Sequence, residues 1–449
     1  MSDASRESSV CRWVILVAIS LLAVAPATSL ASIPNEGTRT PIAREGSPLA
    51  AEKRISRDHL RNILEREIDS VGGASGAYVF DVEANSKRLL YSDSGSNSRI
   101  LASNSKLFTT AAYLDRFGGS GRLKTQVFER GKRQGGRERT LKGSLVLLGD
   151  GDPALAVSGF AASRNLPLTT VGPLAKAVKD AGIRNVKGKI VADPTIFDGA
   201  GSVPMPGVDP DPGDLPTLSG LSFNRGTGDG GGYASSPARN AGEELKRELR
   251  ERGVRVSGGV KVDGVPDRLF ETKPLGSVAS PTAKSLAAQT NTPSDNFYAE
   301  MLLKRLGAGQ NKQGTTARGS GRAETFARKA GSGVNLVNGS GLARSNTASP
   351  KNVAQLLTHM RKDQSEKAAF FDSLAIAGKS GTLSNRMRNT AAEGRCHAKT
   401  GTITGVSALS GYCKAGAGTV AFSILMNNVS ISEAQRAQDA MAAAIARYR

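Results

Sequence analysis

SNSK at residues 103–106 is the stretch that decides the fold of this chain, together with SDN at 294–296 and KTG at 399–401. Each of these patterns is weak evidence alone, because a chain rich in serine and lysine can match any one of them by accident. Taken together and in this order, they indicate a serine hydroxyl that is made nucleophilic by a lysine instead of a histidine.

The first stretch predicts a hydroxyl and an amine on one face of a helix over residues 101–114. Ser103 and Lys106 are three residues apart, so their side chains lie about one turn from each other. A lysine can take the serine's proton only when burial or a second cation lowers its pKa, and Lys399 is a candidate for that cation. The alternative is that Ser103 only caps the helix.

The second stretch is predicted to open a helix over residues 294–306. Ser294 follows Pro293 there, so helix capping is its plainer role. In the catalytic interpretation, its hydroxyl relays a proton from Lys106 to the leaving nitrogen. The amide of Asn296 then holds a substrate amide with its donor and its acceptor.

The third stretch lies on a strand predicted over residues 395–402, where alternate side chains share a face. The ammonium of Lys399 and the hydroxyl of Thr400 are suited to gripping a terminal carboxylate. Gly401 leaves room for a substrate to lie along the strand like an added strand. The alternative is an ordinary strand that carries a basic residue.

A histidine-based triad is the competing scheme, but the chain offers only three histidines. We expect His59 and His359 on helix surfaces, and His397 at the edge of the site without an acidic partner, so a triad is disfavoured. Two other stretches repeat the motif spacings without a predicted structural context, namely SFN at 222–224 and KSG at 379–381.

The first 31 residues read as a signal peptide. Arg6 and Arg12 precede an apolar run over residues 13–25, which is too short to span a bilayer, and SLA at 29–31 offers a cleavage site. A retained membrane anchor is the alternative. We therefore expect an exported protein, periplasmic or otherwise extracytoplasmic.

The chain is strongly basic, with 60 Lys and Arg against 40 Asp and Glu and a formal charge of +20. This charge predicts loose association with anionic envelope surfaces. Nucleic acid is excluded by the expected export and by the absence of basic clusters interleaved with aromatic residues.

Two cysteines, Cys396 and Cys413, lie on neighbouring predicted strands around the third stretch. Exported cysteine pairs tend to oxidise, so a cross-strand disulfide is one hypothesis. Two separate buried thiols are the other, since a sequence does not supply the Cα separation that a bridge needs.

The order of predicted elements implies one α/β domain that is split by an inserted block. A helix and a hairpin about residues 84–85 come first, and three strands and a helix come last, so both ends of the chain should share a sheet. The block over 119–276 is predicted to be mostly β, with two small subdomains and a long surface loop over 199–232. The catalytic domain then consists of 52–118 and 277–449.

With these residues in place, the chain resembles the D-alanyl-D-alanine carboxypeptidases/endopeptidases, the class C low-molecular-mass penicillin-binding proteins with a large insertion. The 191 residues from Ser103 to Ser294 fit that insertion. Local matches are GDGDP at 149–153, SDNFYAE at 294–300 and GSGLAR at 339–344. Asn338 departs from the family's usual Asp, and Lys379-Ser380 replaces a more acidic pair.

This resemblance implies a β-lactamase/transpeptidase-like domain, an antiparallel sheet flanked by helices, that acts on peptidoglycan muropeptides. It implies that β-lactams are covalent inhibitors and that no cofactor or metal is required. The oxyanion would lie between the backbone N–H groups of Ser103 and Thr402. The implied catalytic residues are Ser103, Lys106 and Ser294, and the implied substrate-binding residues are Asn296, Lys399, Thr400, Gly401 and Thr402.

Two rival functions share parts of this evidence. A β-lactamase would use the same acylation chemistry, but the chain lacks a Glu-x-x-Leu-Asn deacylation motif after Ser294 and does not need its insertion for that reaction. A catalytically silent peptidoglycan-binding protein is the second rival. The intact serines, lysines and asparagine of the three stretches argue against it.

Overall fold

The computed structural model describes residues 54–83, 88–136, 139–201, 215–228, 232–265, 272–309, 313–416 and 418–449. These residues belong to one compact unit, Leu49–Arg449. The predicted signal segment 1–31 and the turn predicted about residues 84–85 lie outside the described residues. No helix within the described ranges is both long and apolar enough to cross a membrane.

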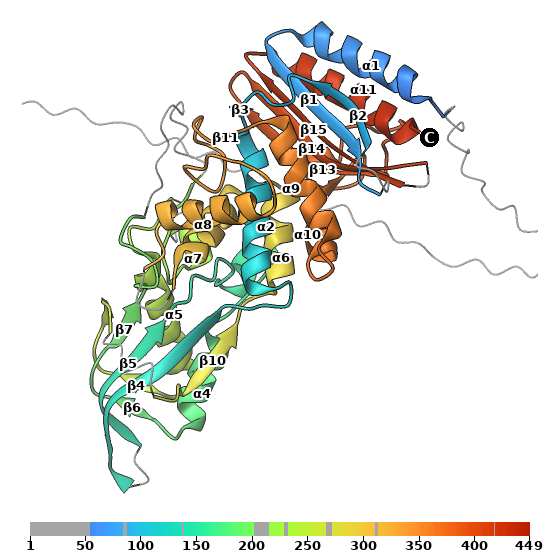
Figure 1. Cartoon of the computed structure of the whole chain (residues 1–449). Coiled ribbons are helices and arrows are strands. Elements are labelled where there is room, and N and C mark those ends of the chain that lie inside the picture. Colours follow the sequence, from blue (N-terminus) through green and yellow to red (C-terminus); the bar gives the residue numbers. More distant parts are fainter. Residues whose placement is uncertain are drawn as a thin grey trace, which may run out of the picture. The chain divides into compact units, whose positions relative to one another are not determined.

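A six-stranded antiparallel sheet joins the two ends of the chain in the order β12-β13-β14-β15-β1-β2 (Figure 1). The first and last described strands of the chain, β1 and β15, are neighbours, with Ala77 opposite Ile424. The fold class predicted from the sequence is thereby confirmed. The strands are β1 (Ala74–Asp81), β2 (Arg88–Asp93), β12 (Ala375–Ile376), β13 (Cys396–Ile403), β14 (Val406–Ala415) and β15 (Gly418–Asn427).

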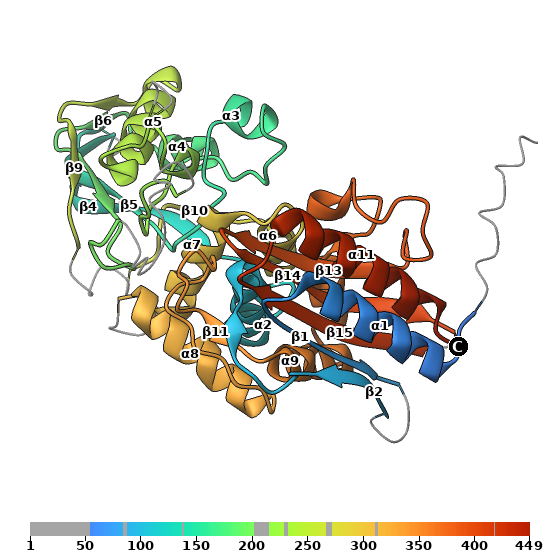
Figure 2. The same ribbon diagram turned by 90° about the horizontal axis from the view of Figure 1, so that it is seen from above.

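Helices cover both faces of this sheet, which is why β14 and β15 are buried along almost their whole length. On one face, α1 (Arg57–Val71) and α11 (Ile431–Arg447) lie side by side (Figure 2). Helix α1 is capped by Ser56 and buries Leu60, Leu64 and Ile68, four residues apart, against the sheet.

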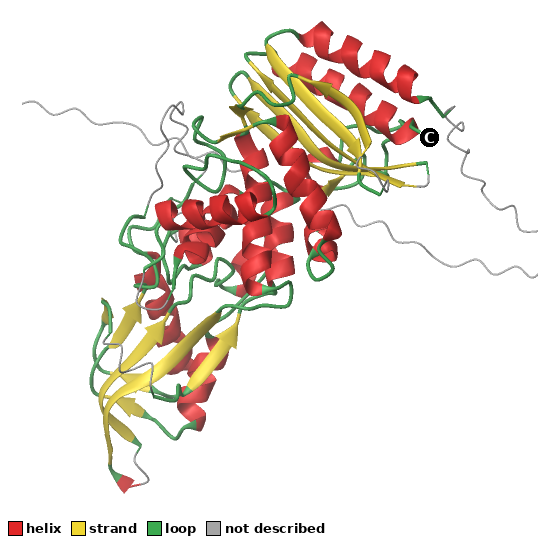
Figure 3. Ribbon diagram, in the orientation of Figure 1, coloured by secondary structure: helices red, strands yellow, loops and turns green. Residues whose placement is uncertain are grey.

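The other face carries the helices that hold the first two motifs. Helix α2 is buried from Ser105 to Leu114 and packs against α6, α7 and α8. Figure 3 shows this helical layer beside the sheet. Its members are α2 (Ser105–Phe117), α6 (Ala283–Asn291), α7 (Asn296–Gly307), α8 (Thr316–Lys329), α9 (Pro350–Lys362) and α10 (Lys367–Asp372), with the short pair β3 (Arg99–Ile100) and β11 (Thr347–Ala348) at its border.

The inserted region forms a second, seven-stranded sheet of mixed direction. Strands β5 to β9 pair in parallel because helices cross over between them, whereas β4 pairs antiparallel with β5 and β10. The strands are β4 (Lys124–Gln134), β5 (Thr140–Leu148), β6 (Asn185–Val186), β7 (Ile190–Asp193), β8 (Arg255–Val256), β9 (Val260–Val262) and β10 (Gly276–Ala279).

Helices contribute more to this region than the mostly β prediction implies. Helix α4 (Gly172–Asp180) and helix α5 (Pro237–Glu251) pack together and bury Leu174 and Leu245 in one apolar core with the strands. The short α3 (Ser158–Ala162) lies between β5 and α4 in the chain.

The described part of the predicted surface loop over 199–232 is irregular, as expected, but its placement on the surface is wrong. Leu218, Leu221 and Phe223 are buried, because they fill space beside the two adjoining apolar cores. The Gly-rich composition suggested a loop, but the apolar side chains between the glycines decide the packing. Residues 202–214 and 229–231 lie outside the described residues.

Candidate active site

The first motif places its lysine at the centre of a buried hydrogen-bond cluster. Lys106 Nζ donates to Ser103 Oγ at 2.8 Å, to Asn296 Oδ1 at 2.7 Å and to the Ser340 carbonyl at 2.6 Å. The side chain of Lys106 is fully buried. One amine therefore touches the candidate nucleophile and the second motif at once.

A sharp turn presents Ser103 to this amine. Ala102 has φ +46°, a backbone conformation that is uncommon for a residue with a Cβ. Residues Ala102–Asn104 form a 3₁₀ turn, and α2 begins only at Ser105. No side-chain cap bond is made at the start of α2, and Ser103 Oγ accepts from Lys106 instead. The capping role that the sequence left open for Ser103 is therefore not the one in the structure.

The second motif lies just outside a helix. The sequence predicted that Ser294 opens the helix, but α7 begins at Asn296 and its N-cap is Asp295, which accepts from Tyr298 N at 3.1 Å. Ser294 has φ +66°, and it is not the residue that caps α7. Its hydroxyl oxygen instead accepts a 2.8 Å hydrogen bond from Lys399 Nζ.

Lys399 is a second buried amine close to the first. Its side chain is fully buried, and its Nζ donates to Ser294 Oγ and, at 2.9 Å, to the Thr400 carbonyl. Burial, and then the nearby positive charge of Lys106, lower the pKa of Lys399 well below its usual value. The amines of Lys106 and Lys399 are therefore close enough to exchange protons with the hydroxyls of Ser103 and Ser294.

Gly401 lets strand β13 approach the Ser103 turn. A Cβ at this position would lie 2.8 Å from the Leu101 carbonyl and 3.1 Å from Ser103 N, so a larger residue would push the strand away. The side-chain amide of Asn104 also donates to the Lys399 carbonyl at 3.2 Å. The third motif is thus held against the turn that carries the first.

The edge of β13 is open beside the motif. Strand β12 pairs only with His397 and Ala398, so among the described residues no strand pairs with β13 on that side from Lys399 onward. Thr402 is exposed there, and Thr400 Oγ1 makes a 2.8 Å hydrogen bond with Thr382 Oγ1. An extended peptide can pair along such an edge.

Glu300 and Ser340, which were not predicted as site residues from the sequence, hold Lys106 in place. Glu300 is fully buried, and its carboxylate accepts from Gly339 N at 3.1 Å and from Ser340 N at 2.7 Å. Burial raises the pKa of Glu300. Its bonds fix the two peptide groups that precede the Ser340 carbonyl, which accepts from Lys106. Both segments resembled family signatures, but nothing in the sequence indicated that they meet.

The departure at Asn338 is accommodated within the same loop. Its Oδ1 accepts from Gly341 N at 3.1 Å and from Asn346 Nδ2 at 2.9 Å. An aspartate could accept the same two bonds, so these two contacts do not require the amide.

The stretches SFN at 222–224 and KSG at 379–381, which repeat the motif spacings, do not join the hydrogen-bond cluster around Lys106. Ser222 is buried, and Asn224 Oδ1 accepts from Val157 N at 3.0 Å within the inserted region. Lys379 forms a 2.5 Å surface ion pair with Glu393. Neither stretch combines a serine with a buried lysine amine.

No histidine within the described residues is hydrogen-bonded to Ser103. His59 is exposed on α1, and His359 lies edge-on to Phe326. His397 stacks on Phe371 with ring centroids 4.2 Å apart, and burial lowers its pKa. A histidine triad has no structural support.

Cys396 and Cys413 form a disulfide that joins β13 to β14, where the two residues are directly opposite each other. Of the two alternatives left open by the sequence, the structure shows the bridge. It anchors the start of the strand that carries Lys399.

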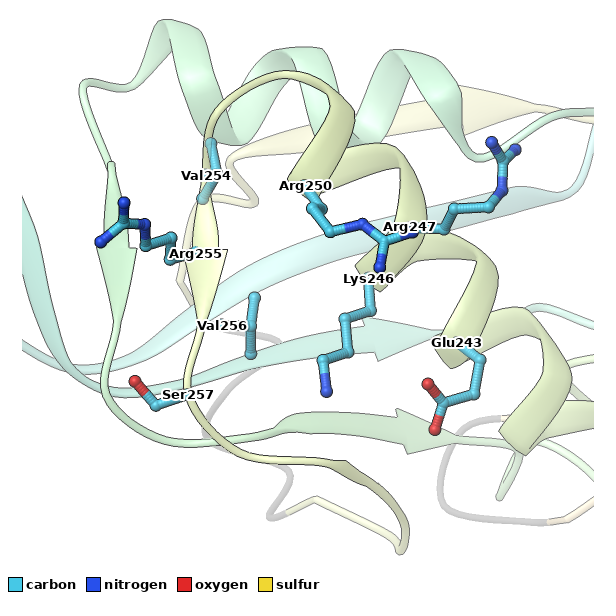
Figure 4. Close-up of a pocket in the computed structure, with 8 residues that line it drawn as sticks. All are labelled: Glu243, Lys246, Arg247, Arg250, Val254, Arg255, Val256 and Ser257. Atoms are coloured by element: carbon cyan, nitrogen blue, oxygen red, sulfur yellow. The ribbon is translucent and has the colours of Figure 1, made fainter.

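A basic groove lies in the inserted region, separate from the cluster (Figure 4). Arg247 is neutralised by ion pairs with Glu244, Glu248 and Glu251 on its own helix. Figure 4 also shows Lys246 and Arg250 on α5 and Arg255 on β8, none of which has an ion pair among the described residues. The groove is lined by Glu243, Lys246, Arg247, Arg250, Val254, Arg255, Val256 and Ser257.

Comparison with known proteins agrees with this geometry. The sequence pattern of the D-Ala-D-Ala carboxypeptidase 3 (S13) family matches residues 56–227 and 233–448. The D-alanyl-D-alanine carboxypeptidase of Actinomadura sp. (strain R39) is 29% identical, over 86% of this chain and 85% of the relative.

Two solved structures have a similar fold. Penicillin binding protein 4 (dacB) from Haemophilus influenzae superposes with a TM-score of 0.69 at 19% identity, covering 84% of this chain and 97% of that chain. The penicillin G-acylated predatory endopeptidase Bd3459 from Bdellovibrio bacteriovorus gives a TM-score of 0.51 at 17% identity, covering 83% and 91%.

Proposed function

Since the chain belongs to the D-Ala-D-Ala carboxypeptidase 3 (S13) family and is a serine-type D-Ala-D-Ala carboxypeptidase, we propose that Ser103 is its nucleophile and Lys106 its general base. The observation that carries this assignment is the 2.8 Å bond from Lys106 Nζ to Ser103 Oγ. The same amine contacts Asn296, so base, nucleophile and substrate-binding amide meet at one point.

In the acylation step, neutral Lys106 takes the Ser103 proton as Oγ attacks the carbonyl of the penultimate D-Ala. Negative charge on that carbonyl oxygen is stabilised by the backbone N–H groups of Ser103 and Thr402. When the C–N bond breaks, the proton passes from Lys106 through Ser294 to the leaving amine. The terminal D-Ala departs, and water then hydrolyses the acyl-enzyme and restores both groups.

The remaining motif residues bind the substrate. Asn296 holds an amide of the stem peptide through its donor, while its acceptor keeps the bond from Lys106. Lys399 and Thr400 provide an amine and a hydroxyl that can donate to the terminal carboxylate, whose negative charge favours the protonated form of Lys399. Gly401 and Thr402 lie on the open edge of β13, where the peptide extends as an added strand.

β-Lactams are proposed to acylate Ser103 through the same steps. The relative Bd3459 has been seen acylated by penicillin G, and its fold is shared by this chain. Peptidoglycan stem peptides that end in D-Ala-D-Ala are the proposed natural substrate, with cross-linked stems as a second substrate if the enzyme is also an endopeptidase.

The proposed organisation follows the motifs. Residues 1–31 form a signal peptide that directs export to the periplasm or another extracytoplasmic space. Residues 52–118 and 277–449 form the catalytic domain, and 119–276 form the inserted region with two small subdomains. The basic groove on that region supports association with anionic envelope surfaces, because Lys246, Arg250 and Arg255 are not neutralised by acidic neighbours among the described residues.

Release of D-Ala tests this function directly. Purified enzyme should free D-Ala from a pentapeptide that ends in D-Ala-D-Ala, and Ser103→Ala should abolish release while it remains folded. Comparison with cleavage of a cross-linked dimer separates carboxypeptidase from endopeptidase activity. Rapid hydrolysis of penicillin would favour a β-lactamase. Binding to cell wall without release of D-Ala would favour a catalytically silent peptidoglycan-binding protein.

A further inference from the structure

One side chain of the second motif points away from the two lysines and toward the inserted region. Ser294 and Asn296 accept from Lys399 and Lys106, but the carboxylate of Asp295, which lies between them, accepts from both Nη atoms of Arg225. One of these two bonds is 3.1 Å long. Three consecutive side chains therefore have three different partners, of which two are the buried lysines and the third, Arg225, belongs to the inserted region.

The Asp295 carboxylate is almost fully engaged. Besides Arg225, it accepts from Gln289 Nε2 at 3.2 Å and from Tyr298 N at 3.1 Å. The side chains of Asp295 and Arg225 are 8% and 21% exposed, so water and salt screen their attraction only weakly. A two-pronged bond of this kind fixes orientation as well as distance, because the planar guanidinium fits a carboxylate in one plane.

The residues next to Arg225 in the sequence are fixed by contacts within the inserted region. Phe223 is buried in the core of that region, and Asn224 Oδ1 accepts from Val157 N. The guanidinium also lies over the Phe297 ring, with its carbon 5.2 Å from the ring centroid. These contacts connect the core of the insertion to the first turn of α7.

The conformation of Ser294 needs such support. Its φ of +66° is unfavourable for any residue with a Cβ and persists only where surrounding contacts impose it. On the C-terminal side, the main contacts that impose it belong to Asp295, whose N donates to the Thr290 carbonyl at 3.0 Å and whose carboxylate is held by Arg225. Loss of the Arg225 bonds would remove the contact that ties this turn to the inserted region.

We propose that Arg225 is a positioning residue through which the inserted region holds the turn of residues 294–296 in its catalytic shape. It touches no reacting atom and acts through Asp295 on Ser294 and Asn296. This inference rests on the proposed function, because it assigns the turn to proton relay and substrate binding. It also gives the insertion a role within the catalytic step.

The test uses the full-length mature protein and a fluorescent penicillin, with the first-order acylation rate constant at saturating drug as the readout. Arg225→Gln should lower this constant about tenfold or more, since small displacements of reacting groups are costly. The rate constant of Arg225→Lys should fall between those of the wild type and Arg225→Gln, because lysine keeps the positive charge but cannot make the two-pronged bond. A rate constant, unlike a labelled amount, does not change when only part of the protein is folded.

Arg305→Gln is the matched control. Arg305 also joins α7 to the inserted region, through a 2.8 Å ion pair with Asp150, but it does not contact the motif turn. It should alter the acylation rate constant less than about twofold, because this partly buried ion pair, with side chains 15% and 25% exposed, lies on α7 away from the motif turn. Asp295→Asn, which keeps a capping side chain, should slow acylation like Arg225→Gln, and the double variant should be no slower than either.

The proposal is overturned if Arg225→Gln acylates as fast as the wild type or as Arg305→Gln, or if its effect and that of Asp295→Asn multiply. The proposed function fails by a different result, namely a wild-type protein that penicillin does not acylate at Ser103. The two failures are therefore distinguishable in one set of experiments.

Discussion

Lys106 Nζ and Asn296 Oδ1 lie 2.7 Å apart although 190 positions separate the two residues in the sequence. The insertion that separates them along the chain therefore does not separate them in space. Instead, the chain builds a second sheet after α2 and then returns to place Asn296 at the start of α7, beside the amine of Lys106.

Glu300 is expected to set the position of the general base. Glu300→Gln leaves an acceptor for only one of the two N–H groups of Gly339 and Ser340, and it sets an NH₂ group against the other. The Ser340 carbonyl should shift, and the acylation rate constant should fall about tenfold or more. Stopped-flow measurement of penicillin acylation checks this. An unchanged rate constant in the folded variant would show that the Ser340 bond to Lys106 is dispensable.

Gly401→Ala should separate the third motif from the first. The added Cβ would lie 2.8 Å from the Leu101 carbonyl, so β13 or the Ser103 turn must move, and acylation should slow by about tenfold to a hundredfold. Gly321→Ala on α8 is the control, because a Cβ there meets nothing within 4 Å. Equal acylation rates in the two variants would refute the close-approach argument.

Asp152 should make stability depend on pH in an unusual direction. Burial raises its pKa to about 6, above the ordinary 3.8, so between these values the folded state holds more protons than the unfolded state. The free energy of unfolding should therefore fall as pH rises through this window, by about 3 kcal/mol in total.

Asp152→Asn provides the comparison, since it keeps an oxygen that can accept from Ala154 N while it removes the charge. Relative to the wild type, the variant should gain stability between pH 4 and pH 7, as measured by urea unfolding. A difference between the two proteins that stays constant over that range would mean that Asp152 titrates normally.

The disulfide should contribute to stability more than to chemistry. It closes a loop with a sequence separation of 17, so the double variant Cys396→Ala/Cys413→Ala should lose about 3 kcal/mol of unfolding free energy. Acylation should persist, because eight residue pairs set the register of β13 against β14. Loss of acylation in a folded double variant would show instead that the bridge shapes the site.

The sequence predicted those features that local patterns determine. The strand predicted over residues 395–402 differs from β13 by one residue at each end, and the spacing in SNSK placed Ser103 beside Lys106. The left-handed backbone of Ser294 was not predictable, because proline followed by serine and aspartate is also a good helix start. Its conformation depends on contacts with β13 and the inserted region.

Long-range partners of the site were also beyond sequence reasoning. Glu300 and Ser340 lie on separate elements, and Arg225 follows a stretch that seemed to be a chance match in a surface loop. Each of these contacts arises when two packed regions meet, and no spacing within one region encodes it. Helix α4 is a different case, because Pro173 in its first turn and the apolar face of Leu174, Ala175 and Val178 are local helix signals that were not recognised in the sequence.

The central claim is that Ser103 forms the acyl-enzyme, and mass spectrometry of peptides from penicillin G-treated protein tests it most directly. The predicted result is a single adduct of the intact penicilloyl mass on the peptide that contains Ser103, with no adduct in Ser103→Ala. An adduct on a different residue, or persistent labelling of Ser103→Ala, would contradict the assignment of the nucleophile.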